Sequence, residues 1–328
     1  MSLSPRDRII GGLIGLVVGD ALGVPVEFSG RHSRDLDPVT GMRGFGTHNQ
    51  PPGTWSDDGA MALASAAAFV AHGADDLAQV RGFLGWLDEA QWTAHGRVFD
   101  VGNTTRNSLM RVRLEFPLEE TGGADERDNG NGSLMRILPA SCWWFGAGTL
   151  TVVQRLGQSS AHTHAHIRSR LGCALHALVS EALIEGAAID AAMSTASQRL
   201  RRHVPPDERA VLSRLMDGTC LALPRERVPS DGYVVSTLEA SCWCLHHHRD
   251  FSAAVLAAVN LGGDTDTTGA VTGGLAGLRC GVAGIPQEWI TALPRRDDVL
   301  GLAEQFADAC LSFWSSEAAQ TTPIQALG

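Results

Sequence analysis

The sequence predicts one compact all-α domain over residues 1–328, on three observations. Alanine, leucine and glycine dominate the periodic segments, and runs rich in β-branched residues are scarce. Apolar residues recur at three- and four-residue spacings, as in HALVSEALIEGAAIDAAMSTASQRL, and strand–helix alternation of the parallel α/β kind is missing. With 44% hydrophobic and 19% charged residues, the composition is that of a globular protein.

The periodic segments predict fourteen helices in chain order. They are expected over residues 6–22, 57–72, 76–92, 103–115, 133–145, 150–157, 166–186, 189–202, 207–220, 232–247, 251–261, 267–281, 286–291 and 297–315. Gly186 is expected to stop the helix that begins near residue 166. The most loop-like stretch is Leu118–Ser133, which is long enough to be functional. A tail from about residue 316 is expected to be frayed.

The N-terminus resembles the first two regions of a signal peptide, because Arg6 and Arg8 precede the apolar run IIGGLIGLVVG. Asp20 interrupts the pattern, however, and no clean cleavage site follows. The run is also shorter than a bilayer requires, so a buried helix of the mature protein is expected. Seven cysteines, an odd number without a C-x-x-C pair, are typical of reduced thiols. A cytoplasmic location is therefore expected.

Charge and composition exclude several classes of function. A net charge of −10 argues against non-specific binding to nucleic acid or to an anionic membrane. The chain contains no lysine, which excludes Schiff-base catalysis, a pyridoxal-phosphate lysine and a Walker lysine. The histidines of HHH, residues 246–248, lack a second ligand pair at zinc spacing.

Two adjacent acids open a helix in GTWSDDGAMALASAAAF, residues 53–69. Ser56, Asp57 and Asp58 are suited to helix capping, because their oxygens accept free N–H groups of the first turn. One acid is enough for that role, and the second adds like-charge repulsion. Capping is the simpler interpretation of this stretch when it is taken alone.

A second cluster of the same kind occurs in NLGGDTDTTGAVTGGLAGLRCG, residues 260–281. Asp264, Asp266 and Thr267 again open a run of small residues, about 200 positions further along the chain. Carboxylates and hydroxyls are the ligands of hard cations such as Mg²⁺, Mn²⁺ and Ca²⁺. If the two helix N-termini meet, their four carboxylates need cations or protons to be stable together. The pattern therefore predicts a metal site.

Two further acids lie on predicted loops. Glu27 follows Pro25 in GDALGVPVEF, so it is expected on a loop just past the end of a helix. Asp100 precedes the helix expected to be capped by Asn103 or Thr104, and it is also a loop acid. For both acids, a solvated surface carboxylate is the alternative interpretation.

A glycine-rich loop and a histidine cluster complete the set. DNGNGSLMR, residues 128–136, runs into a helix, and its N–H groups could hold a diphosphate with help from Ser133. The histidines at 162, 164 and 166 do not share a helical face. They do not predict a three-histidine metal site, although one of them can face a ligand.

Taken together and in this order, these motifs resemble the ADP-ribosylglycohydrolase family, the relatives of dinitrogenase reductase-activating glycohydrolase. The resemblance runs from about Ile9 to Gly284. It rests on GDALGVPVEF, GTWSDDGAM, FDVGNTTR, NGNGSLMRILP, HTHAHIRS and GGDTDTTGAVTGGLAG. It implies a compact orthogonal bundle of α-helices with two Mg²⁺ or Mn²⁺ ions in a central cleft.

The resemblance also implies roles for individual residues. One ion would be bound by Ser56, Asp57 and Asp58, and the other by Asp264, Asp266 and Thr267, with Asp266 as the bridge. Glu27 and Asp57 would be catalytic. Substrate would be bound by Asp100, Gly130, Asn131, Gly132, Ser133, Leu134, Met135, Arg136 and His164. Gly59 departs from the pattern, because many members have threonine there; metal binding is expected to survive, with a changed helix start or pocket wall.

The implied reaction is hydrolysis of an N- or O-glycosidic bond of an ADP-ribosyl group through an oxocarbenium-like state. The partner would be ADP-ribose, or an ADP-ribosylated protein or small molecule. Two alternatives stay open at this point. One is another dinuclear Mg/Mn hydrolase that acts on a nucleotide phosphate bond, and the other is a non-catalytic ADP-ribose-binding relative.

Overall fold

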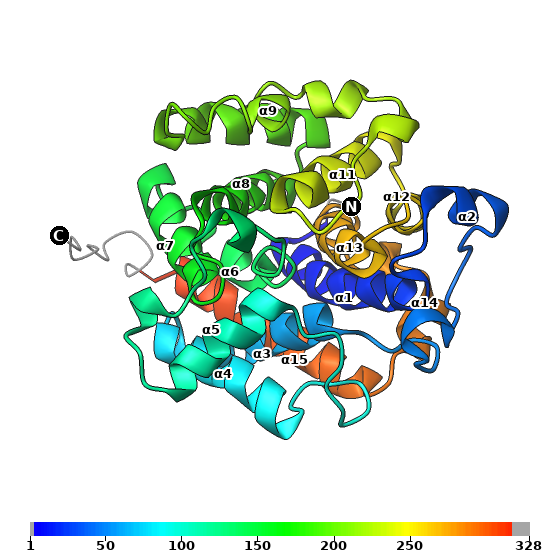
Figure 1. Ribbon diagram of the computed structural model, residues 1–328, viewed down its shortest axis with the longest axis horizontal. Helices are drawn as coiled ribbons and strands as arrows, with labels where there is room; N and C mark the ends of the chain where they lie inside the picture. The colour runs from blue at the N-terminus through cyan, green and yellow to red at the C-terminus, as the bar shows by residue number, and fades with distance from the viewer. Residues whose placement is uncertain (1–2, 317–328) are drawn as a thin grey trace.

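A computed structural model describes residues 3–316 of the chain. Within this range it contains fifteen α-helices and no β-strand, only three isolated β-bridges, so the all-α prediction is confirmed (Figure 1). The tail that the sequence predicts to be frayed falls almost entirely outside the described residues.

Two helices lie at the centre of the molecule, α1 (Pro5–Gly23) and α13 (Thr265–Cys280) (Figure 1). The others are α2 (Arg31–Leu36), α3 (Asp57–His72), α4 (Asp76–Glu89), α5 (Asn103–Arg113), α6 (Leu138–Trp143), α7 (Thr149–Ala161), α8 (Ile167–Ile184), α9 (Ile189–Leu200), α10 (Ser213–Met216), α11 (Val234–His247), α12 (Phe251–Val259), α14 (Gln287–Ala292) and α15 (Arg296–Trp314).

Glycines allow α1 and α13 to pack with their backbones in contact. A Cβ atom added to Gly15 would lie 2.4 Å from the carbonyl oxygen of Gly273, and one added to Gly19 would lie 2.0 Å from that of Gly269. The glycines recur every four residues, so they share one face of each helix. The pairing is antiparallel, and it places the C-terminal end of α1 beside the N-terminal end of α13.

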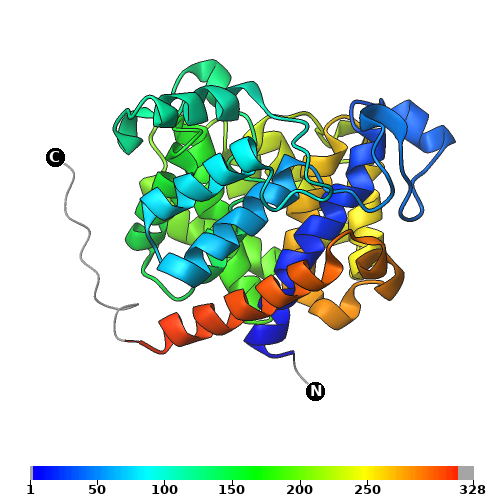
Figure 2. The ribbon, with the colours of Figure 1, turned by 90° about the horizontal axis from the view of Figure 1, so that it is seen from below.

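The remaining helices surround this pair on two sides. In Figure 1, α8, α9 and α11 lie above it, while α3, α4, α5 and α15 lie below. Figure 2 shows α15 crossing α1, with which it is in contact. One large hydrophobic core includes side chains from every described helix except α2. The N-terminus of α3 therefore reaches the same region as the central pair.

One stretch, Pro5–Val26, is long and apolar enough to cross a membrane, with a mean hydropathy of 2.0. This corrects the expectation that the N-terminal run is too short, because the helix extends beyond that run. The whole apolar window is buried inside the fold, as in the core helix of a globular protein.

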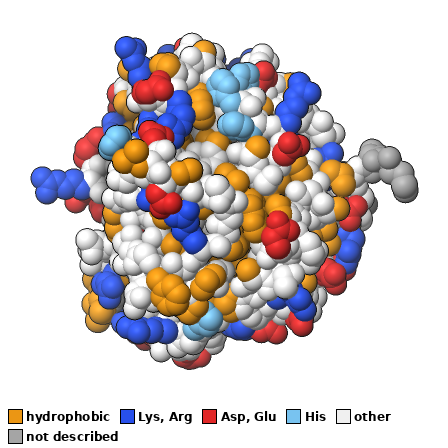
Figure 3. Space-filling model, turned by 90° about the vertical axis from the view of Figure 1, so that its right-hand side faces the viewer, with side chains coloured by type: hydrophobic (Ala, Val, Ile, Leu, Met, Phe, Trp, Pro, Cys, Tyr) orange, Lys and Arg blue, Asp and Glu red, His pale blue; other side chains and the backbone are white. Residues whose placement is uncertain are grey.

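On the face shown in Figure 3, acidic and basic side chains are interspersed, without a large patch of one sign.

Two predicted helices are much shorter in the structure, and one described helix was not predicted. The segment 133–145 is helical only from Leu138, since its glycine- and asparagine-rich start forms turns and Pro139 occupies the first turn of α6. The segment 207–220 contains the single turn α10, preceded by turns and followed by a 3₁₀ turn over Thr219–Ala222. The short α2 has no apolar period that could have revealed it.

Candidate functional site

Asp20, near the C-terminal end of α1, is fully buried and caps α3. Its carboxylate accepts the backbone N–H of Ser56 at 2.9 Å and that of Gly59 at 2.7 Å. The Ser56 hydroxyl accepts the N–H of Asp58 at 3.3 Å. These acceptors satisfy the N–H groups of Ser56, Asp58 and Gly59 at the start of the helix. The carboxylates of Asp57 and Asp58 are therefore not required as caps.

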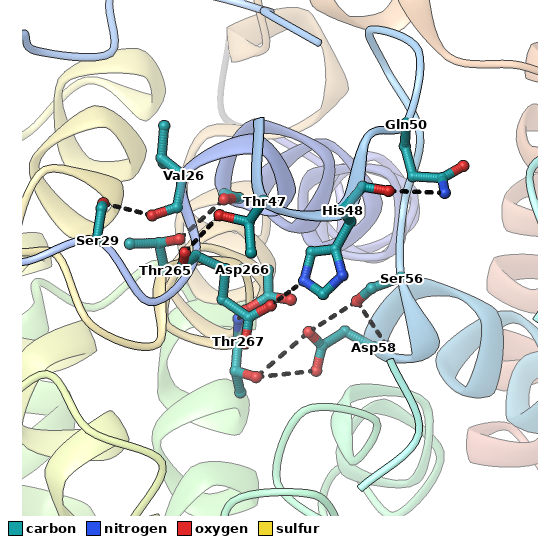
Figure 4. A network of polar contacts seen from close by, with 12 residues as sticks. Val26, Ser29, Thr47, His48, Gln50, Ser56, Asp58, Thr265, Asp266 and Thr267 are labelled. Carbon is teal, nitrogen blue, oxygen red and sulfur yellow. Dashed lines mark hydrogen bonds and ion pairs between the residues drawn. The ribbon is translucent and has the colours of Figure 1, made fainter. Parts of the chain in front are cut away.

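The two acid clusters meet directly. Thr267, in the first turn of α13, donates its hydroxyl to the carboxylate of Asp58 at 3.3 Å. Figure 4 shows Asp58 between Ser56 and Thr267. The glycine-mediated contact of α1 and α13 brings these helix starts together, because Asp20 holds α3 from the end of α1.

Six acids converge at this point. Oxygens of Asp20, Asp58 and Asp266 lie within 4.8 Å of one another, and the same is true of Glu27, Asp264 and Asp266. Asp57, beside Asp58, is also buried. The metal-site hypothesis required the two helix N-termini to meet, and the structure has this arrangement.

Burial makes these carboxylates costly to ionise. It raises the pKa of Asp57, Asp58 and Asp266 well above the ordinary value, and neighbouring carboxylates raise it further. Burial also raises the pKa of Asp264, against the opposing hydrogen bond from Asn131. The cluster therefore holds protons, or needs positive charge from outside the chain.

The donor set fits hard divalent cations. Oδ2 of Asp264 accepts the side-chain amide of Asn131 at 2.9 Å, whereas its buried Oδ1 has no hydrogen-bond partner among the described residues. Hydroxyls of Ser56 and Thr267 lie beside the carboxylates of the cluster. Carboxylate and hydroxyl oxygens, without thiolate, are the ligands that Mg²⁺ and Mn²⁺ prefer.

Glu27 follows the 3₁₀ turn η1 (Val24–Val26) at the end of α1. It is buried, so the alternative of a solvated surface glutamate is wrong. Burial raises its pKa to about 7, although a hydrogen bond from His48 acts in the opposite direction. A carboxyl group with such a pKa can hold or accept a proton near neutral pH.

Asp100 lies close to Glu27, at the edge of the site. Oxygens of both acids and a ring nitrogen of His48 lie within 4.8 Å of one another. The charge of Asp100 raises the pKa of Glu27 and of Asp57. Its backbone is left-handed, with φ of +53°, which is strained for a residue other than glycine. Asp100 is thus part of the site rather than a loop acid away from it.

The predicted phosphate loop, Gly130–Arg136, lies against the segment before α11. Asn131 N–H donates to Gly232 at 3.0 Å, and Gly130 forms an isolated bridge with Tyr233. Within the described residues, the N–H groups of Gly132, Ser133 and Leu134 have no hydrogen-bond acceptor. Consecutive free N–H groups of this kind are suited to an anion.

Several side chains of this loop point into the core and not toward a ligand. The Ser133 hydroxyl is fully buried and is hydrogen-bonded to that of Ser160 at 2.8 Å. Arg136 donates to Thr163 at 2.8 Å and stacks over the ring of Phe83. Leu134 and Met135 are core residues. The binding role of the loop stays a prediction.

The ring of His164 packs against the loop at Gly132. A Cβ atom on Gly132 would lie 2.7 Å from its ring, so a larger residue there would have to displace the ring. Burial lowers the pKa of His164 to about 3, which keeps the ring neutral. Its neighbours have other partners, Asp76 for His162 and Glu126 for His166. The three histidines therefore do not form one metal site, while the contact of His164 with substrate stays a prediction.

Sequence reasoning missed two residues of this site. Asp20 stands in the motif GDALGVPVEF and interrupts an apolar run, but the sequence alone assigns it no role, although a lone acid inside a buried helix is itself a signal of a specific partner. His48 lies in a loop 21 residues beyond Glu27, and nothing in its surroundings in the sequence indicates the contact between them.

Gly59, where many family members have threonine, packs against Trp55 and Asp20, which leaves no room for a larger side chain without adjustment.

Known proteins of one family resemble this chain in sequence and in fold. The family model described as ADP-ribosylglycohydrolase matches residues 1–313. The chain is 34% identical over 300 residues to ADP-ribosylarginine hydrolase Tri1 of Serratia proteamaculans, covering 91% of this chain and 78% of the relative. It is 32% identical over 296 residues to the ADP-ribosyl dinitrogen reductase glycohydrolase of Rhodospirillum rubrum, covering 88% and 91%. A solved structure described as an ADP-ribosylglycohydrolase-related protein complex is similar with a TM-score of 0.79 and 30% identity, covering 94% of this chain and 99% of that one.

Proposed function

The chain belongs to the ADP-ribosylglycohydrolase family and is a hydrolase of glycosyl bonds, and from this premise we propose that it removes ADP-ribose from arginine side chains with the help of two divalent cations. The observation that carries the proposal is the convergence of buried acids from the starts of α3 and α13. The arginine linkage is supported by the similarity to relatives named ADP-ribosylarginine hydrolase.

Two Mg²⁺ or Mn²⁺ ions would be held by oxygens already grouped in the structure. Ser56, Asp57 and Asp58 are proposed for one ion, and Asp264, Asp266 and Thr267 for the other. When bound, such ions offset the repulsion among the carboxylates, orient ribose hydroxyls and lower the pKa of a water. The free Oδ1 of Asp264 and the hydroxyl pair around Asp58 support this assignment.

The other residues of the site bind and orient the substrate. The free N–H groups of Gly132, Ser133 and Leu134 are proposed to hold the diphosphate. Asn131 cannot turn toward it without releasing Asp264 and Thr237, to which it is hydrogen-bonded. This loop therefore connects diphosphate binding to the position of one proposed metal ligand.

Glu27 is proposed to stabilise the positive charge on the ribose and to accept a proton from the attacking water. Breaking the bond to the anomeric carbon builds positive charge on the ribose, which a nearby carboxylate stabilises. A carboxyl with a pKa of about 7 can also accept a proton from the attacking water near neutral pH. The charge of Asp100 beside it favours a cationic leaving group such as a guanidinium.

A panel of ADP-ribosyl substrates tests the proposal. Arginine-linked, serine-linked and free ADP-ribosyl compounds would be incubated with Mg²⁺ or Mn²⁺, and all products identified. We expect free ADP-ribose, with fastest release from arginine. Inorganic phosphate or AMP would instead indicate a phosphate-bond hydrolase. Binding of ADP-ribose without turnover of any substrate would indicate a non-catalytic relative.

A further inference from the structure

We infer that His48 is the positioning residue for the Glu27 carboxylate. The inference rests on the proposed function, in which Glu27 acts on the ribose. The ring Nε2 of His48 is hydrogen-bonded to Oε2 of Glu27. Donation from Nε2–H fixes one oxygen of the carboxylate and restricts rotation of the group. The other oxygen is then left for the reacting atoms.

The loop that carries His48 holds the backbone of Glu27 as well as its side chain. The hydroxyl of Thr47 donates to the carbonyl oxygen of Glu27 at 2.7 Å. The amide of Gln50 donates in turn to the carbonyl oxygen of His48 at 3.1 Å. Figure 4 shows Thr47, His48 and Gln50 arranged along this loop above the acid cluster. Two consecutive residues thus bind the two ends of one glutamate.

The segment around Glu27 and the loop that carries His48 both contain residues with unusual backbone angles. Phe28, Phe45 and Asn49 all have left-handed φ angles, between 51° and 66°. Gly46 is also left-handed, and a Cβ atom there would lie 1.8 Å from the carbonyl oxygen of Pro25. Strain of this kind persists only where the surroundings determine the conformation, and it is concentrated at functional sites. Packing of the loop could be achieved without a histidine that contacts the buried carboxylate of Glu27, so this contact points to a function beyond packing.

Two aromatic rings flank His48. The ring of His48 lies 5.3 Å from that of Phe99 and 6.2 Å from that of Phe28, centre to centre. Its side chain is 16% exposed, and that of Glu27 is 6% exposed. Limited access of water strengthens the hydrogen bond, so the orientation of the carboxylate is maintained before substrate arrives.

Kinetics of His48→Ala and His48→Gln test the inference. In His48→Ala we expect kcat to fall by about 10- to 100-fold, within the range for acid–base help, while KM changes by less than about threefold. His48→Gln should recover part of the loss, because its amide can still donate to Glu27. Melting temperature and its increase with Mn²⁺ should stay as in the wild type. The control is His95→Ala, because His95 contacts Thr54 and not Glu27.

A double-mutant cycle separates positioning from direct contact with substrate. If His48 acts through Glu27, His48→Ala should have almost no further effect in a Glu27→Gln background. An equal loss in both backgrounds would overturn the inference, and so would unchanged kcat in His48→Ala. A wild type that releases no ADP-ribose from any substrate would instead contradict the proposed function itself.

Discussion

At the residue scale, the acids that open α3 carry more charge than their helix requires. Asp20 reaches over from α1 and accepts the N–H groups of Ser56 and Gly59. Asp57 and Asp58 are therefore left with buried charges that no cap explains. Buried like charges lower stability unless something else compensates them, which supports the proposal that these residues bind cations.

Neutralising one acid of each cluster tests that view. We expect Asp57→Asn and Asp266→Asn each to abolish metal-dependent release of ADP-ribose while the fold is retained. Without metal, the melting temperature of each variant should equal or exceed that of the wild type, because one repelling carboxylate is gone. Circular dichroism and a product assay measure the two effects. Full activity in either variant would rule out the proposed roles.

Glu27→Gln separates chemistry from binding. Glutamine keeps the size of the side chain and its contact with His48 but cannot take up a proton. ADP-ribose affinity should stay within about tenfold, while turnover falls by roughly 10²–10⁴. Calorimetric titration and single-turnover rates measure the two quantities, with the exposed Glu304→Gln as control. A proportionate loss of affinity and turnover would make Glu27 a binding residue instead.

The raised pKa values predict how stability depends on pH without metal. Burial raises the pKa of Asp20 from 3.8 and that of Glu27 from 4.5, each to about 7. Between about pH 4 and 7 the folded state binds protons that the unfolded chain has released, so the free energy of unfolding falls as pH rises. Stability gained from these protons is fully lost above about pH 7.

Melting in EDTA between pH 5.5 and 8 measures this dependence. The wild type should lose stability mainly between pH 5.5 and about 7, and Asp266→Asn should lose less because it carries one carboxyl fewer. A wild type that becomes more stable with rising pH would show that the acids are ionised and compensated within the chain itself.

The sequence allowed the acids to be predicted but not all of their partners. Asp57, Asp58, Asp264 and Asp266 stand in short motifs whose residue types already indicate a cation site. The capping by Asp20 and the contact of His48 join residues far apart in the chain, and these depend on how helices and loops pack. Local patterns do not encode such pairs.

At the element scale, the glycines of α1 and α13 determine where the site forms. Each helix has glycines at four-residue spacing on the face toward its partner, so the two backbones touch. This close contact sets the end of α1, with Asp20 and Glu27, beside the start of α13, with Asp264 and Asp266. A wider helix separation would move these acids apart.

Gly19→Ala should therefore lower stability strongly. The added methyl would lie 2.0 Å from the carbonyl oxygen of Gly269, a backbone atom that cannot turn away. We expect a loss of at least about 3 kcal/mol, at the upper end for overpacking. The control is Gly301→Ala in α15, which meets nothing within 4 Å and should gain up to about 1 kcal/mol. Urea unfolding compares them; similar effects at both positions would contradict the packing argument.

Helix periodicity predicted the long elements well, because their apolar residues repeat over many turns. The prediction Asp57–His72 for α3 matches the structure, and that for α13 begins two residues late. Errors occurred where turn-forming residues precede a short helix, as before Leu138 and Ser213. In such segments the tertiary contacts decide how far the helix extends.

At the scale of the whole molecule, the site exists only when both ends of the chain are folded together. α1, α3 and α13 each contribute an end, and the loops before α6 and α11 complete the surroundings. Cations that bind this assembled site, but not the unfolded chain, would stabilise the native state. Folding and metal binding are then linked, since the carboxylates are held together at a cost that the ions relieve.

The count of Mn²⁺ ions bound per chain tests the central claim most directly. Metal-free protein would be dialysed against a series of Mn²⁺ concentrations at pH 8, and bound and free ions measured by electron paramagnetic resonance. The account predicts two Mn²⁺ ions per wild-type chain, magnetically coupled, and a smaller number in Asp57→Asn and Asp266→Asn. A wild type that binds no Mn²⁺, or a count unchanged in both variants, would contradict it.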